Sequence, residues 1–144
     1  MKKLCLVLPL FLLLSTPVHA TSLQADNYPD ITPQLIRCTC YTAEEGDITA
    51  DGSKVREGIV AGKREWLGYT CIIYENDNGK IGDLIGIYEF KDTGAGIDTD
   101  CDGKGDSIKK GLSIDVYRDT LERCYEWIDQ YGDYVYIQVV YGVG

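Results

Sequence analysis

The chain has 144 residues, of which 14 are basic and 23 acidic, so its formal net charge is −9. A surface with this excess of carboxylates repels nucleic-acid backbones and anionic membranes, so we expect neither as a partner. The length suits one domain with one modest hydrophobic core.

The N-terminus has the three-part pattern of a cleavable secretion signal. Lys2 and Lys3 carry positive charge, residues 4–14 form an apolar run, and residues 18–20 (Val-His-Ala) end the segment with small side chains. The apolar run is shorter than the roughly 20 residues that a membrane-spanning helix needs. We therefore expect a signal peptide over residues 1–20, a mobile lead-in over residues 21–34 and a secreted domain over residues 35–144.

Removal of the signal would also remove His19, which is the only histidine of the chain. A mature protein without histidine has no Ser-His-Asp triad, no Cys-His pair and no histidine-ligated zinc. Any proton transfer would then depend on carboxylates, tyrosines or lysines.

Six segments rich in β-branched and aromatic residues predict strands. They are residues 35–42, 59–61, 68–75, 81–90, 112–117 and 133–140. Asn78 and Gly79 favour a hairpin turn between the third and fourth segments. Residues 43–58 and 92–111 are rich in glycine and acidic residues, which indicates two long loops.

Residues 119–131 predict the single helix. Asp119 is placed to cap its N-terminus, Glu122 follows three residues later, and Gly132 ends it. Its apolar stripe consists of Leu121, Cys124, Tyr125 and Ile128. Six strands followed by one late helix indicate an all-β fold, a small closed β-barrel.

Five cysteines remain after signal removal, which predicts disulfide bonds in an oxidising compartment. They are Cys38, Cys40, Cys71, Cys101 and Cys124. The odd number permits at most two bridges. Cys38 and Cys40 point to the same face of a strand, so we expect separate partners for them. The pairing stays open, and the alternative is a thiolate nucleophile or a metal ligand.

Two aspartates are candidates for proton transfer. Asp92 ends a strand and precedes Thr-Gly-Ala-Gly, where glycines let the backbone approach a ligand closely. Asp115 lies within a β-branched strand, and an inward-facing Asp115 would be desolvated, with a raised pKa and the properties of a general acid. Strand alternation alone favours the other reading, in which Asp115 faces solvent.

Several short segments, taken in order, resemble the 3D domain, a family named for three aspartates. The segments are residues 39–42, 51–61, 67–68, 92–94, 108–109 and 114–117. The family is shared by the membrane-bound lytic transglycosylase A family and by small exported muralytic enzymes of Gram-positive bacteria. The resemblance covers residues 38–141 and implies a six-stranded double-psi β-barrel with one late α-helix.

The resemblance also implies cleavage of the peptidoglycan glycan strand without water, which gives a 1,6-anhydro product and requires no cofactor. Asp115 matches the acid/base position of the family and Asp92 matches its second aspartate, so both are candidate catalytic residues. The candidate substrate contacts are Tyr41, Thr42, Lys109 and Trp66, the last in a loop where we expect it to be exposed for stacking on a sugar.

Residues 98–106 form an acidic run in which aspartates alternate with other residues before a glycine. This pattern is typical of the start of a calcium-binding loop, where several oxygens converge on the ion, and it is similar to a thrombospondin type-3 calcium repeat. The candidate ligands of a structural calcium are Asp98, Asp100, Asp102, Lys104 and Asp106. Lys109 stands where an EF-hand has its final glutamate, and the alternative is a solvated acidic loop.

The first of the three family aspartates has no counterpart at residues 61–63 (Ala-Gly-Lys). Two alternatives to an enzyme therefore stay open. One is a non-catalytic cell-wall or carbohydrate-binding module, and the other is a secreted domain that docks a protein partner through its acidic loop. We expect a monomer outside the cell, with peptidoglycan strands as the partner of the enzyme or the binding module.

Overall fold

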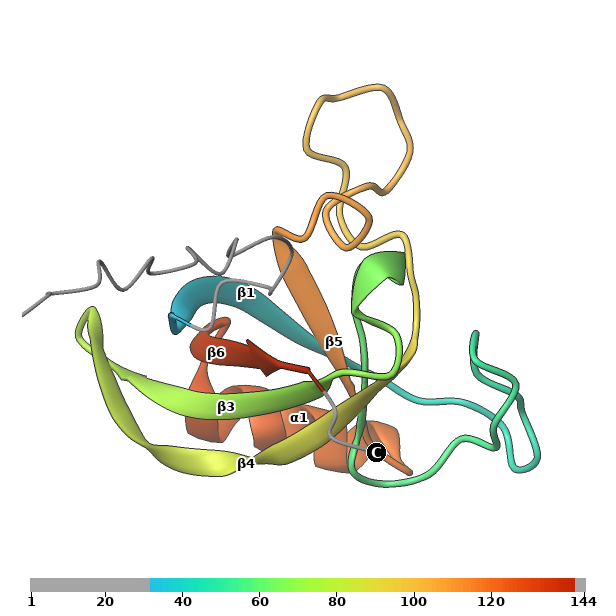
Figure 1. Cartoon of the computed structure of the whole chain (residues 1–144), viewed down its shortest axis with the longest axis horizontal. Helices are drawn as coiled ribbons and strands as arrows, with labels where there is room; N and C mark the ends of the chain where they lie inside the picture. The colour runs from blue at the N-terminus through green and yellow to red at the C-terminus, as the bar shows by residue number, and fades with distance from the viewer. Residues whose placement is uncertain (1–31, 142–144) are drawn as a thin grey trace, which may run out of the picture.

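The computed structural model describes residues 32–141 (Figure 1). The expected signal peptide and nearly all of the expected lead-in lie outside these residues. The elements are β1 (Gln34–Tyr41), β2 (Ile59–Ala61), a 3₁₀ turn (Arg64–Trp66), β3 (Thr70–Asp77), β4 (Lys80–Asp92), β5 (Ser113–Tyr117), α1 (Leu121–Tyr131) and β6 (Tyr134–Val140). The six predicted strands and the predicted helix are confirmed, with their ends shifted by one or two residues where they differ.

The strands form one mixed sheet that closes into a ring in the order β1-β5-β2-β4-β3-β6, with β6 paired to β1. β1 runs parallel to β5, and β2 runs parallel to β4. The other neighbouring pairs are antiparallel. Most neighbours in the ring are distant in sequence, so residues far apart in the chain meet on its surface.

Alternate residues of the strands point into the ring and form the hydrophobic core. The strand residues of this core are Ile36, Cys38, Val60, Cys71, Ile73, Tyr88, Phe90, Ile114, Val116, Val135, Ile137 and Val139. Ile114 and Val116 both belong to the core, so the residue between them, Asp115, lies on the outer surface of the ring.

The predicted hairpin between β3 and β4 is confirmed. Asn78 and Gly79 both have positive φ, 51° and 84°, which glycine and asparagine tolerate best. The Asn76 side chain accepts a hydrogen bond from the Gly79 N–H at 2.8 Å and closes the turn.

Helix α1 begins two residues later than we predicted, and its N-cap lies one residue later. Thr120, rather than Asp119, is the N-cap, because its hydroxyl accepts a hydrogen bond from the Arg123 N–H at 3.3 Å. Asp119 pairs instead with the Arg123 guanidinium at 3.0 Å. Gly132 ends the helix as predicted. The helix lies against β1 and contributes Trp127 to the core.

The cysteines are unbonded thiols in the structure, so none of the expected disulfides is present among the described residues. Cys38 and Cys40 pack on the same side of β1, as predicted. The Cys40 thiol of β1 interacts with the Cys124 thiol of α1. Cys101 is exposed in the loop between β4 and β5.

Two long loops extend from the ring. The loop between β4 and β5 rises above the start of β5 in Figure 1, and the loop between β1 and β2 extends to the right. Within residues 32–141, the structure has no helix that combines the length and the apolar character needed to cross a bilayer.

Candidate functional site

Four neighbouring strands bring the two candidate aspartates into one row on the outer surface of the ring. In the register, Asp92 of β4 lies opposite Ala61 of β2, and Ala61 lies opposite Asp115 of β5. Thr39 of β1 continues the row beside Asp115. Asp92 and Asp115 are therefore two strand spacings apart, roughly 10 Å between backbones. The structure thus places the two aspartates that were 23 positions apart in sequence on either side of one alanine.

Asp115 is partly buried even though it points away from the core. Burial desolvates its carboxylate and raises the pKa from 3.8 to about 6. No group among residues 32–141 donates a hydrogen bond to this carboxylate. An acid without fixed donors keeps its oxygens available to another molecule, and a pKa near 6 lets it both give and take a proton near neutral pH.

The loop between β4 and β5 comes close to Asp115 at Gly94. A β-carbon added at Gly94 would lie 3.9 Å from Asp115 Oδ2 and 2.9 Å from Ile108 Cδ1. Ile108 is fully buried beside it. Only glycine fits at position 94 without moving Ile108, so this residue lets the loop backbone approach the carboxylate closely.

Asp92 is held in a different manner. Its Oδ1 accepts hydrogen bonds from the Ala50 N–H at 3.0 Å and the Thr93 N–H at 2.9 Å. Its Oδ2 accepts one from the Tyr41 hydroxyl at 3.0 Å. Asp92 therefore joins the end of β1, the loop between β1 and β2 and the end of β4. This arrangement suits a positioning role better than proton transfer.

Tyr41 lies close to both aspartates. Its pKa is raised above the usual value of 10.0, chiefly by burial and also by the negative charge of Asp92 and Asp115. Its ring meets that of Tyr117 edge to face, with centroids 5.5 Å apart. Tyr41 thus stays a neutral hydroxyl fixed next to the row of aspartates.

The other expected substrate contacts separate in the structure. Thr42 follows β1 and is exposed. Trp66 is buried, 7% exposed, and packs on Phe90 with ring centroids 5.1 Å apart, so the expectation of an exposed, sugar-stacking Trp66 was wrong. The 3₁₀ turn that follows β2 directs this side chain into the core. Lys109 is exposed and lies near the aspartates, in the pocket described next.

A surface pocket of about 220 Å³ lies between the segment that follows β2 and the loop between β4 and β5. It is lined by Gly62, Lys63, Arg64, Glu65, Thr93, Gly94 and Lys109. We call it the cationic pocket. Sequence reasoning missed Lys63 and Arg64. The available signal was a pair of basic residues directly after a short buried strand in an acidic chain.

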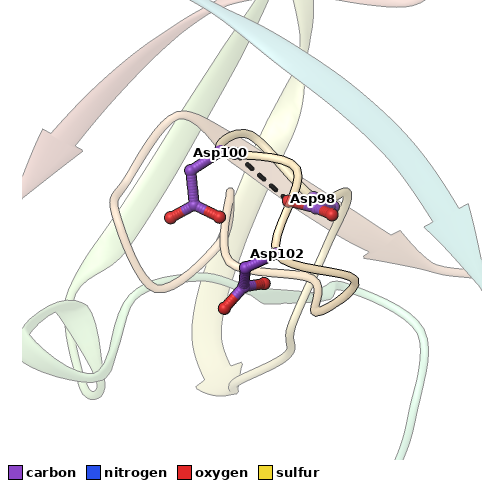
Figure 2. Close-up of side chains that lie close together, drawn as sticks. All are labelled: Asp98, Asp100 and Asp102. Atoms are coloured by element: carbon purple, nitrogen blue, oxygen red, sulfur yellow. Dashed lines mark hydrogen bonds between the residues drawn. The ribbon is translucent and has the colours of Figure 1, made fainter.

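The acidic loop, residues 98–106, brings three of the five proposed calcium ligands together (Figure 2). One carboxylate oxygen from each of Asp98, Asp100 and Asp102 lies within 4.8 Å of the others. Asp98 sits under the turn and accepts hydrogen bonds from the N–H groups of Cys101 at 2.7 Å and Gly103 at 2.8 Å. These donors, led by the Gly103 N–H, lower the pKa of Asp98.

Lys104 and Asp106, the other two proposed ligands, do not belong to this group of three. Asp106 forms an ion pair with Lys110 and accepts hydrogen bonds from the Thr99 N–H and hydroxyl at 3.0 and 2.7 Å. Lys110, followed by Thr99, lowers the pKa of Asp106 to about 2. The Lys104 side chain is exposed and cationic, and an ammonium does not ligate a metal.

The base of the acidic loop is tied to the strand that carries Asp115. The Ile97 N–H donates to the Ser107 hydroxyl at 2.9 Å, and that hydroxyl meets the buried Ser113 hydroxyl at 2.7 Å. Ser113 begins β5, two residues before Asp115. These hydrogen bonds therefore connect the acidic loop to β5, the strand that contributes Asp115 to the aspartate row. Searches of protein-family models, curated proteins and solved structures found no match to this chain.

Proposed function

We propose that this protein is an exported, cell-wall-acting enzyme that cleaves peptidoglycan glycan strands without water, with Asp115 as its acid and base. The observation that carries the proposal is the state of Asp115. It is a desolvated carboxylate without a hydrogen-bond donor among the described residues, and it lies near Gly94, which lines the cationic pocket. Purely structural carboxylates are usually ion-paired or hydrogen-bonded, as Asp92 and Asp51 are here.

We further propose that the closed ring is a double-psi β-barrel of the three-aspartate type. Its support is the strand count, the closure of β6 onto β1, and the two parallel pairs among antiparallel neighbours. The sequence segments that resemble the 3D domain include the ends of β1, β4 and β5, which meet in the row of Asp92 and Asp115.

The proposed reaction needs one carboxyl group in two states. Protonated Asp115 donates its proton to the oxygen that joins N-acetylmuramic acid to N-acetylglucosamine, and the bond from that oxygen to the muramoyl C1 breaks. The resulting Asp115 carboxylate accepts the proton of the muramoyl 6-hydroxyl, whose oxygen bonds to C1. The product is a 1,6-anhydro sugar, and Asp115 regains its proton.

Asp92 and Tyr41 take positioning roles in this scheme. The hydrogen bond between them fixes the tyrosine hydroxyl in the neighbourhood of Asp115. The mature protein then needs neither histidine nor a cofactor for the chemistry. We propose that it acts as a secreted monomer on the wall.

A binding module on the same ring is the second candidate, and Ala61 is the observation that favours it. Ala61 stands between Asp92 and Asp115 in the row, at the place where the resemblance locates the first aspartate of the family. An alanine supplies neither charge nor a hydrogen bond there. Such a module would bind the glycan through the cationic pocket without cleaving it.

The test is mass spectrometry of the soluble products from purified sacculi. The mature protein is expected to release anhydro-muropeptides, and Asp115→Asn to release none. Asp83→Asn is the matched control, because Asp83 is an exposed β4 residue away from the aspartate row. If folded wild-type protein releases nothing while a known lytic enzyme works in parallel, the binding module replaces the enzyme.

We also propose that Asp98, Asp100 and Asp102 bind a structural calcium ion. Their convergent carboxylate oxygens support this, because calcium prefers several hard oxygen ligands. The ion would brace the acidic loop and would take no part in the reaction.

A further inference from the structure

The cationic pocket concentrates positive charge in an acidic protein. Three of its seven lining residues, Lys63, Arg64 and Lys109, are basic, and Glu65 is its single acid. Elsewhere among the described residues, Arg37, Lys54, Lys80 and Lys104 also form no ion pair, and the other basic side chains are neutralised. Arg56, Lys91, Lys110, Arg118 and Arg123 each form an ion pair with a carboxylate.

The three cations of the pocket have no such partner. No carboxylate oxygen of residues 32–141 lies within ion-pairing distance of Lys63, Arg64 or Lys109. The Lys63 ammonium lies over the Trp66 ring, 4.9 Å from its centroid, which holds the lysine stem in place while the charge stays available. The pocket therefore has the electrostatics of an anion site.

The location of the pocket connects it to Asp115. Thr93 and Gly94 line the pocket, and a β-carbon added at Gly94 would lie 3.9 Å from Asp115 Oδ2. A molecule whose reacting oxygen reaches Asp115 would therefore have a neighbouring group within reach of the pocket.

At about 220 Å³ the pocket is smaller than the roughly 300–1,000 Å³ of sites that enclose a whole ligand. It fits one substituent rather than a sugar chain.

We propose that the cationic pocket binds a carboxylate carried by the peptide stem of the glycan strand, and that it thereby selects wall material with free stem carboxylates. This inference rests on the proposed function, because it assigns a substrate group to the surface beside Asp115. In an intact strand, the stem peptides are the source of such carboxylates next to the muramoyl sugar that Asp115 would cleave.

The test measures binding to sacculi in the Asp115→Asn background, so that cleavage does not remove the target. The double variant Lys63→Gln/Lys109→Gln is compared with Lys80→Gln, an exposed lysine in the β3–β4 hairpin. Each protein is pelleted with native sacculi and with sacculi whose carboxylates have been converted to amides. Melting temperatures establish that all variants are folded.

The double variant should bind native sacculi about fivefold to tenfold more weakly than Asp115→Asn alone, with Lys80→Gln unchanged. On amidated sacculi, the three proteins should bind equally and weakly. Equal binding of all proteins to both kinds of sacculi would overturn the inference. Anhydro-muropeptides released by wild-type protein would in that case leave the proposed function intact. Absence of binding to native sacculi by every protein would reject the pocket as a wall-binding site.

Discussion

Asp115 and Asp98 carry the same side chain in two regions that treat it in opposite ways. Asp115 is partly buried, no described group donates a hydrogen bond to it, and desolvation raises its pKa to about 6. Asp98 lies at the surface, several N–H groups point at its oxygens, and its pKa is lowered. The first environment favours a neutral acid and the second a permanent anion.

The difference shows how the same loop produces both environments. Between β4 and β5, Gly94 lies near Asp115, while the turn at residues 98–103 presents its own N–H groups to Asp98. A proton donor needs the first arrangement, and a calcium ligand needs the second. The comparison therefore supports the proposal that Asp115 transfers a proton and that Asp98 has a structural role.

The largest expected effect is on the rate of glycan cleavage. Because the first step needs protonated Asp115, the rate should fall about tenfold per pH unit above pH 6, and be about 100-fold lower at pH 8 than on its low-pH side. Asp98→Asn should leave this profile unchanged. The measurement is the initial rate of anhydro-muropeptide release from pH 4.5 to 8. A rate that stays constant across this range would remove Asp115 as the acid.

The next effect is on stability, with opposite signs for two carboxylates. Asp115 has a folded pKa near 6 against an ordinary value of 3.8, so the folded state holds its proton more tightly. Its contribution to stability is present below pH 4 and is lost as pH rises through 6, by about 2–3 kcal/mol. Asp115→Asn should abolish this loss, as measured by urea unfolding at pH 4 and pH 8.

Asp106 provides the matched carboxylate of opposite sign. Its folded pKa is about 2, so its contribution is present above pH 3.8 and is lost as pH falls toward 2. Asp106→Asn should thus change the unfolding free energy near neutral pH and have little effect near pH 2. If both variants changed stability in the same direction over pH 4 to 8, the contrast between the two regions would be incorrect.

Calcium should have the smallest effect. A loop without the final glutamate is expected to bind with a Kd of roughly 10⁻⁴–10⁻³ M. Calcium at 1 mM would then add about 0.4–1.4 kcal/mol and raise the melting temperature by a few degrees. Asp102→Asn should remove the shift, and Asp83→Asn should retain it. The shift is measured from melting curves recorded with calcium and with chelator. Identical curves for wild-type protein would mean that the loop binds no calcium and is a solvated acidic loop.

Local patterns predicted most of the fold. Strand propensity identified all six strands, and Asn78-Gly79 identified the hairpin, because these signals depend on neighbouring residues. The N-cap was one residue off, because Asp119 and Thr120 both carry a capping oxygen and the competing pair with Arg123 decides between them.

The site was only partly predictable. The alternation of side chains along a strand correctly placed Asp115 on the outer face of β5. This pattern could not show that the loop between β4 and β5 approaches that face at Gly94. Lys63 and Lys109 share a pocket only because the ring brings the end of β2 to the loop before β5. The burial of Trp66 likewise depends on where the chain turns after β2. The cysteine count could not show which thiols meet.

The closed ring leaves one stretch of backbone unpaired. β4 is the longest strand, and it pairs with β2 only from Glu89 onward. On the side away from β3, no described strand pairs with residues 80–88, and three apolar side chains there, Ile81, Leu84 and Ile87, are half or more exposed. Such an edge is a template on which a second chain can add a strand and start aggregation. Lys80 and Asp83 place charge along it, and breaks in the pairing with β3 near Tyr74 interrupt its regularity. We therefore expect the tendency of this protein to aggregate at high concentration to depend on the β3–β4 hairpin more than on its core.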